Sequence, residues 1–504
     1  MKKFKILSLI GIAILAVSCE EDFLETYPTA SLSQEQVSEA VAVNPDAAAG
    51  TLLGIYENLY RIGSGGVGGQ EDYGIKTQDI QLDILSGDMA HLGKSYNRQT
   101  QISELTATVN PDSNYNYIPW RFLYRVINLS NLVIDGLGGD SADLTTDVQK
   151  HTMGQARALR GWAYYWLVNL FVDDIANLSA PAVPIYTSAD QLEQPKSSVQ
   201  AVFNQAISDL LAAETLLEGF SRTNKIEMNQ DIVRGILAYT YGALNDWSKT
   251  EEYAQKVVTA GYPIMTAEEV TVLGDDDTIG GFNDVNSHPG IIWGIDITAQ
   301  NELYSLGTWW GWMDYHSYSY AAVGNYKGMD INLYNQFRAD DIRITQFPFG
   351  PGALLPARKF YYKGAQEKNF RGFSGPQLNV DSDAHFMRVS EMYLLHAEAA
   401  AENGNEAAAK ASLKALLDER VDDSSYIDDL SGQDLIDEIV LQTRLELFAE
   451  GKAYFLMKRR RMTKTRGPNW LDYAGDSFNH NDDRLTYEIP QSEILFNPNI
   501  SDQN

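Results

Sequence analysis

The fold of this chain is decided by residues 386–421, which read FMRVSEMYLLHAEAAAENGNEAAAKASLKALLDERV. Apolar side chains recur at helical spacing in each half, so the stretch predicts two amphipathic helices. Gly404 suits the left-handed position that ends a helix, and Asn405 can cap the helix that follows. A hairpin this short cannot bury its own apolar stripes. The sequence therefore predicts stacking on similar hairpins.

An ordinary helical bundle and a helical-repeat scaffold both fit that hairpin. Residues 231–260 favour the repeat, because small and aromatic side chains alternate there with tetratricopeptide-like spacing. Helix pairs are expected at about 115–172, 197–260 and 386–461, with residues 430–461 as one long helix. Residues 268–375 are rich in Gly, Asp, Pro and aromatics, and they predict a loop-rich region with short strands such as 291–295.

The composition narrows the class of partner. The chain has 504 residues and a formal net charge of −29. Nucleic acid and an anionic lipid surface would both repel it, which argues against either as the main partner. The 28 Tyr and 9 Trp residues allow aromatic platforms on the surface.

The N-terminus predicts export. Lys2, Lys3 and Lys5 precede an apolar run at residues 6–17 that is too short to span a membrane. Small residues then precede Cys19, the sole cysteine, as in a lipoprotein lipobox, although Leu15 sits one place early. We expect a signal peptide at 1–18, a lipid on Cys19 and a tether at 19–35; an ordinary signal peptide is the alternative.

No motif in the sequence predicts catalysis or a cofactor. Residues 63–68 match G-x-G-x-x-G, but they follow a predicted helix rather than a strand, so a loop is the better interpretation. The seven histidines lack paired metal-ligand spacing, and there is no G-x-S-x-G elbow. We expect no cofactor and no metal. Carboxylate pairs of the glycoside hydrolase kind stay possible, because their spacing is spatial.

Several stretches together resemble the SusD/RagB family of nutrient-binding outer-membrane lipoproteins. They are a helix of the form R-x-x-E-x-Y-L-x-x-A-E-A, a helix of the form R-x-E-L-x-x-E-G, and a closing I-P-x-x-E-x-x-x-N-P segment. The matching residues are Arg388, Glu391, Tyr393, Leu394, Ala397, Glu398 and Ala399; Arg444, Glu446, Leu447, Glu450, Gly451 and Phe455; and Ile489, Pro490, Glu493, Asn497 and Pro498. Lys452 departs from the family's common arginine. The similarity spans almost the whole mature chain.

This resemblance implies a mainly α, tetratricopeptide-like superhelix over residues 36–504, with a loop-rich ligand face and minor short β segments. It implies a surface-exposed lipoprotein of the cell outer membrane that covers a SusC-type TonB-dependent transporter. It also implies binding of an oligosaccharide or polysaccharide without catalysis. A surface glycoside hydrolase, a peptide-binding uptake lipoprotein and a purely structural or adhesive repeat protein remain alternatives.

The first candidate ligand site is the aromatic stretch at residues 304–326. Its rings crowd a Gly- and Ser-containing segment with no helical stripe, so we expect some of them to reach solvent and stack on a sugar. The alternative is that the rings fix a long insertion to the helices. The candidate residues are Trp309, Trp310, Trp312, Tyr315 and Tyr318.

The second candidate is the loop at residues 86–98, with Asp88, Tyr96 and Arg98. In the resembled family, loops near these two chain positions tend to line the ligand face. No fixed residue motif carries over from the family to either loop.

Overall fold

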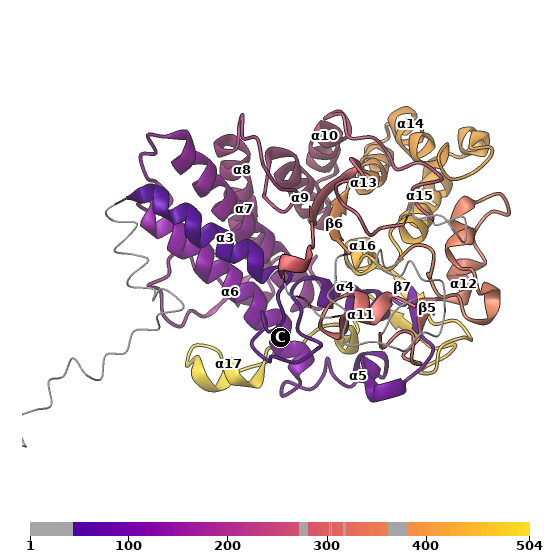
Figure 1. Ribbon diagram of the computed structural model, residues 1–504, viewed down its shortest axis with the longest axis horizontal. Coiled ribbons are helices and arrows are strands. Elements are labelled where there is room, and N and C mark those ends of the chain that lie inside the picture. The colour runs from indigo at the N-terminus through magenta and orange to yellow at the C-terminus, as the bar shows by residue number, and fades with distance from the viewer. Residues whose placement is uncertain (1–43, 272–280, 302, 304, 316–318, 361–381) are drawn as a thin grey trace, which may run out of the picture.

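The computed structural model describes residues 44–271, 281–301, 303, 305–315, 319–360 and 382–504 (Figure 1). The predicted signal peptide, the tether with Cys19, and Tyr318 lie outside these residues. Among the described residues, no helix combines the length and the apolar character that a membrane crossing requires.

Helices make up most of the described secondary structure. The longer ones are α3 (Ala48–Asn58), α4 (Lys76–Leu85), α6 (Asn114–Gly136), α7 (Asp147–Leu170), α8 (Val199–Leu216), α9 (Gln230–Ala243), α10 (Trp247–Val258), α13 (Val389–Glu402), α14 (Glu406–Leu417), α15 (Gly432–Glu446) and α16 (Lys452–Arg460). The short ones are α5 (Thr100–Ser103), α11 (Trp310–Met313), α12 (Ile331–Tyr334) and α17 (Gln491–Phe496).

The strands are short and form separate antiparallel pairs. They are β1 (Met89–His91) with β5 (Lys327–Met329), β2 (Pro181–Pro184) with β3 (Lys196–Ser198), β4 (Ile291–Ile295) with β6 (Ala384–Arg388), and β7 (Thr463–Thr465) with β8 (Ser477–Asn479). The predicted strand at 291–295 is therefore confirmed. It pairs with the segment that leads into α13. Strands β4 and β6 therefore bring together the two ends of the chain between residues 295 and 384, which we call the long insertion.

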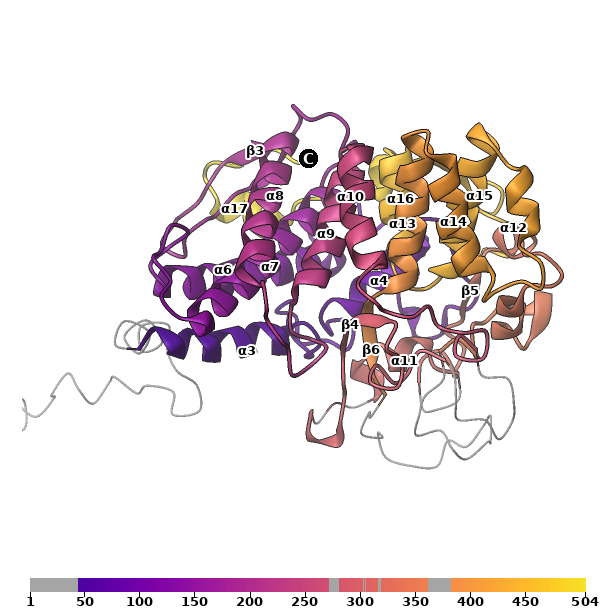
Figure 2. The ribbon, with the colours of Figure 1, turned by 90° about the horizontal axis from the view of Figure 1, so that it is seen from above.

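The helices from α6 to α10 pack side by side in chain order, and α13 and α14 continue the row after the insertion (Figure 2). The α13–α14 turn has the predicted form. Gly404 has a φ of +76°, and the Asn405 side chain accepts a hydrogen bond from the Ala408 amide. Thr146 and Gln149 form a capping box at the start of α7. The expected tetratricopeptide-like helical architecture is confirmed.

The prediction of a single long helix at 430–461 is wrong. The chain breaks between α15 and α16, where Ala449 and Gly451 have φ values of +63° and +74°. A Cβ on Gly451 would lie 2.8 Å from the Cα of Asp79, so the close approach of α4 requires glycine here. Helical periodicity continues through the break, which is why the sequence pattern did not reveal it.

The break places Glu446 and Glu450 next to Arg388. We call the group formed by these three side chains, Arg343 and Arg420 the charge cluster. Arg388 lies 2.6 Å from Glu446 and 2.9 Å from Glu450. Arg420 and Arg343 approach Glu446 at 2.9 and 3.1 Å. All five side chains are buried. Burial opposes ionisation, but Arg420 and Arg388 outweigh it and hold the pKa of Glu446 well below its usual range.

Candidate ligand-binding site

The two loops that the sequence singled out meet in space. Strand β1 pairs with β5, so Met89 lies opposite Met329. Beyond the strands the pairing continues, because the Leu92 amide donates to the Tyr326 carbonyl at 2.8 Å and the Ser95 amide to the Gly324 carbonyl at 3.4 Å. Residues more than 200 positions apart in the chain are therefore held side by side.

Asn325 fixes the turn at residues 93–98 from below. Its buried amide nitrogen lies 3.3 Å from the carbonyl oxygen of Gly93, 3.2 Å from that of Ser95 and 3.0 Å from that of Arg98. A single side chain thus supports three backbone positions of the turn. This contact explains how the turn keeps an unusual backbone conformation.

The turn is strained and carries an exposed ring. Tyr96, Asn97 and Gln99 have φ values of +63°, +53° and +52°, although none is glycine. Left-handed residues of this kind are costly and concentrate at functional sites. The Tyr96 side chain is 68% exposed and meets the Tyr320 ring edge to face at 5.5 Å. We call the surface formed by Tyr96, Arg98 and Gln70, with Tyr320 buried beneath it, the Tyr96 face.

Polar groups lie around Tyr320, the residue whose ring Tyr96 contacts. The Arg98 guanidinium lies 4.9 Å from the Tyr320 ring centroid and donates to the Tyr320 hydroxyl at 3.2 Å. Tyr320 in turn donates to the Gln70 side chain. The Arg98 Nε is buried and has no hydrogen-bond partner among the described residues. The face therefore combines an apolar ring with hydrogen-bonding groups, which is the combination a sugar needs.

The aromatic stretch at 309–315 is placed differently. Trp309, Trp310, Trp312 and Tyr315 are all buried, so the prediction that some of these rings reach solvent is wrong. The Trp310 indole donates to the Asp383 carbonyl at 3.1 Å, and the Tyr315 hydroxyl to the Lys327 carbonyl at 2.6 Å. The rings fix the insertion to the rest of the protein, as in the alternative interpretation.

Trp312 is buried directly behind the Tyr96 face. Its ring stacks on Tyr320 at 4.6 Å and on Tyr73 at 6.2 Å. It therefore supports the ring that Tyr96 contacts without reaching solvent itself. Tyr320 and Gln70 were not among the predicted site residues. The aromatic run gave a general signal for Tyr320, whereas nothing in the sequence pointed to Gln70.

Asp88 is also buried rather than placed on the surface. Its carboxylate pairs with Arg444 at 2.6 Å and with Lys464 at 3.2 Å. Burial would raise the pKa of Asp88, but the two cations outweigh burial and lower it. Asp88 thus connects the start of β1 to α15 and β7. Of the second loop's candidates, Tyr96 and Arg98 lie on the Tyr96 face and Asp88 does not.

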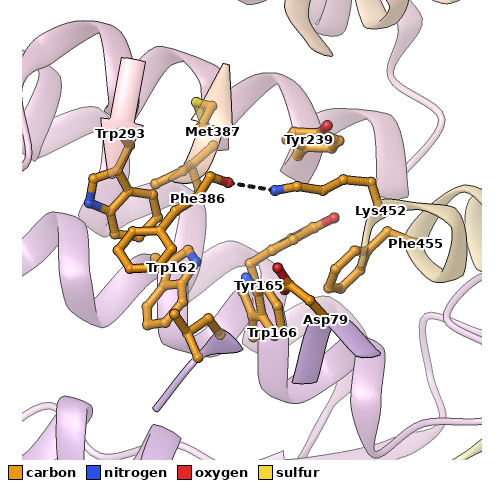
Figure 3. A pocket seen from close by; sticks show the side chains of 12 residues that line it. Asp79, Trp162, Tyr165, Trp166, Tyr239, Trp293, Phe386, Met387, Lys452 and Phe455 are labelled. Atoms are coloured by element: carbon orange, nitrogen blue, oxygen red, sulfur yellow. Dashed lines mark hydrogen bonds between the residues drawn. The ribbon is translucent and has the colours of Figure 1, made fainter. Parts of the chain in front are cut away.

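An internal cavity between α4, α7, α9 and α16 is too small for a glycan (Figure 3). Its volume is about 30 Å³, which suits a water molecule or two. Aromatic rings line it, and Lys452 crosses it to donate to the Phe386 carbonyl at 2.9 Å. Within the described part of the chain, no three His, Cys, Asp or Glu side chains gather as a metal site requires.

Two family models match the chain. One is described as starch-binding associating with outer membrane and covers residues 59–241, and the other is described as the SusD family and covers residues 359–504. The chain belongs to the SusD/RagB family. The motif residues Arg388, Glu446 and Glu450 are members of the buried charge cluster, so they identify the SusD scaffold rather than a ligand.

Solved structures agree over most of the chain. A SusD-like carbohydrate binding protein from Bacteroides vulgatus is 25% identical, with a TM-score of 0.72 over 90% of this chain and 96% of that one. A SusD superfamily protein from Bacteroides thetaiotaomicron is 22% identical and shares the fold, with a TM-score of 0.73 over 91% and 99%. SusD-like protein P25 from Formosa agariphila is 25% identical over 221 residues, which span 43% of this chain and 38% of that relative.

Proposed function

We propose that this SusD-family protein is a non-catalytic, surface-exposed lipoprotein that captures oligosaccharides and delivers them to a SusC-type TonB-dependent transporter. Family membership supports this role, as does the similarity to a carbohydrate-binding protein of known structure. The observation that carries the proposal is the exposed ring of Tyr96 on a turn of left-handed residues. We place the glycan there.

The chemistry of the Tyr96 face suits a sugar. The C–H face of a pyranose is apolar and stacks on an aromatic ring, while its hydroxyl groups need donors and acceptors close by. Tyr96 supplies the ring, and Arg98 and Gln70 supply polar groups next to it. Asn325 holds the turn in place before the ligand arrives, so little ordering accompanies binding.

The test compares ligand binding by the wild type and by Tyr96→Ala. Binding to a panel of neutral and acidic oligosaccharides and short peptides is measured by tryptophan fluorescence and by calorimetry. We expect the variant to lose affinity for the cognate glycan while its circular dichroism stays unchanged. Tyr241→Ala, which removes a partly exposed tyrosine from the helix row, is the matched control. Wild-type affinity in Tyr96→Ala would place the ligand elsewhere. Binding of peptides alone would favour the peptide-uptake alternative.

Absence of catalysis and anchoring through Cys19 are tested separately. Purified protein incubated with the panel should release no reducing ends, and turnover that survives repurification would favour the glycoside hydrolase alternative. Cells grown with a labelled fatty acid should acylate the wild type and not Cys19→Ala. Equal labelling of both would refute the lipid anchor.

A further inference from the structure

A second hollow lies along α6. It has a volume of about 750 Å³ and is formed by three segments. Helix α6 supplies residues from Tyr117 to Asn131, the loop after β2 supplies residues 186–191, and α17 supplies Ser492, Glu493 and Phe496. We call this hollow the α6 groove. It is large enough for several sugar rings.

Two arginines in the α6 groove have no acidic partner in the described part of the chain. Arg121 and Arg125 lie one helical turn apart and are exposed, and neither forms an ion pair or a hydrogen bond with a described residue. This is unusual in a chain with a net charge of −29. Arg121 packs over Gly66, where an added Cβ would collide with its side chain. The backbone of the 63–68 loop therefore limits where this guanidinium can lie.

The one carboxylate that lines the α6 groove is already engaged. Glu493 accepts from the Trp120 indole at 3.3 Å and from the Asn497 amide at 2.8 Å. The groove thus presents two guanidinium groups that form no ion pair with a described residue. The nearby carboxylates of Glu493 and Asp135 are held by neutral donors instead, Asp135 by the Ser188 hydroxyl and the Ala189 amide. Guanidinium pairs of this kind match carboxylate and sulfate groups, because their parallel N–H donors fit two oxygens at once.

The rest of the lining suits a saccharide. The side chains of Tyr117, Asn128 and Ser492 lie in the groove without a hydrogen-bond partner among the described residues, so they can bind hydroxyl groups. Phe496 is 80% exposed and offers an aromatic ring at the edge. Two other strongly exposed apolar side chains, Leu192 and Leu495, lie beside residues of the groove rather than in its lining.

We propose that the α6 groove is a second binding site, for saccharides that carry carboxylate or sulfate groups. Arg121 and Arg125 bind the acidic groups, and Phe496 with the free polar side chains contacts the sugar rings. A protein segment is the rival occupant. The polar lining favours the saccharide, because a protein partner would be expected to bury its apolar contacts in the centre of the groove. The proposal stands independently of the Tyr96 face.

The experiment measures binding of three tetrasaccharides of equal length by calorimetry: a uronate, its carboxyl-reduced neutral form, and a sulfated form. We expect at least one acidic probe to bind tenfold or more tightly than the neutral one, and the two acidic arms to separate carboxylate from sulfate recognition. Arg121→Gln/Arg125→Gln should lose this preference. Arg121→Lys/Arg125→Lys should keep part of it, because the charge remains and the paired donors do not.

Two controls make the result decisive. Lys249→Gln/Lys414→Gln removes the same charge from exposed helix faces outside the groove and should bind like the wild type. Tyr96→Ala should keep the preference for acidic over neutral probes, which separates this site from the Tyr96 face. The proposal would be overturned if all three probes bound with equal affinity, or if Arg121→Gln/Arg125→Gln bound them like the wild type. It would also be overturned if Lys249→Gln/Lys414→Gln lost as much affinity as the arginine-to-glutamine variant. A last outcome would also overturn it: Arg121→Gln/Arg125→Gln binds saccharides normally but no longer associates with the co-produced transporter. That result would assign the groove to a protein partner.

Discussion

Two stretches that the sequence marked as ligand sites differ in the structure. The cluster at 309–315 contains three tryptophans and is buried, whereas the turn at 95–99 contains a single tyrosine and exposes it. Aromatic density therefore did not indicate exposure. Large rings bury a large apolar area, so a dense cluster of them can hold a long insertion to the core without any ring reaching solvent.

The backbone differs between the two stretches in the same way. Helix α11 is a single turn that directs its rings into the protein, and Lys76 and Lys327 lie 5.0 and 5.7 Å from the ring centroids of Trp309 and Trp312. The turn at 95–99 instead holds left-handed residues, and the buried Asn325 amide supports them through the carbonyl groups of Ser95 and Arg98. Exposure and strain together, rather than ring count, are the features on which we propose the Tyr96 face as the ligand site.

Removal of a buried ring should have the largest effect on this comparison. Trp310→Ala should lower the free energy of unfolding by about 3–5 kcal/mol, because it leaves a cavity and removes the hydrogen bond to Asp383. Urea denaturation followed by circular dichroism measures the change. Tyr96→Ala should alter stability by less than about 0.5 kcal/mol. Similar losses in the two variants would contradict the division between a buried and an exposed cluster.

Loss of the exposed ring should act on binding instead. Tyr96→Ala should weaken binding of the cognate glycan by about 1–3 kcal/mol, on the scale known for bases stacked on aromatic rings. That corresponds to roughly ten- to hundredfold in affinity. Tyr96→Phe should bind nearly as well as the wild type, because it keeps the ring. If the phenylalanine variant lost as much affinity as the alanine variant, the hydroxyl rather than the stacking face would be the contact.

The pH dependence of stability tests whether water is excluded from the buried aromatic cluster at 309–315. Lys327 lies beneath Trp312, and burial lowers its pKa to about 7. An unfolded lysine has a pKa of roughly 10.4. Between the folded and the unfolded pKa, the unfolded state binds more protons than the folded state, so the free energy of unfolding rises with pH. Replacing Lys327 by a residue that does not titrate should reduce the slope of the free energy of unfolding against pH by up to about 1.4 kcal/mol per pH unit.

The measurement compares urea denaturation of the wild type and Lys327→Met between pH 7 and pH 9, approximately the range set by that shift. Burial also lowers the pKa of Lys458 to about 7, and that lysine contributes a slope of the same sign in both proteins. The difference between the two slopes therefore isolates Lys327. Identical slopes would mean that Lys327 is hydrated and charged in the folded state.

The smallest effect is expected from relief of strain in the turn. Asn97→Gly should change the free energy of unfolding by less than about 1 kcal/mol, because glycine adopts a φ of +53° without a steric cost but gains freedom when unfolded. Glycan affinity should fall by less than about tenfold, since a looser turn is less well ordered before binding. A stability loss above about 2 kcal/mol would show that the turn belongs to the folding core rather than to the ligand face.

The sequence by itself determined the helical architecture. Periodic apolar positions, the Gly404 turn and the Asn405 cap are local features, and each acts through neighbours three or four residues away. The motifs around Arg388, Glu446 and Glu450 identified the family for a related reason, because the charge cluster they build is part of the scaffold itself.

Only the tertiary structure decided which candidate residues face solvent. Tyr96 and Trp312 are both aromatic residues in predicted loops, yet one is exposed and the other is buried behind Tyr320. The break before α16 depends likewise on the approach of α4 to Gly451. In each case the deciding contact joins residues far apart in the chain. Burial is set by such contacts and not by local periodicity, so which side chains are exposed could not be predicted from either loop alone.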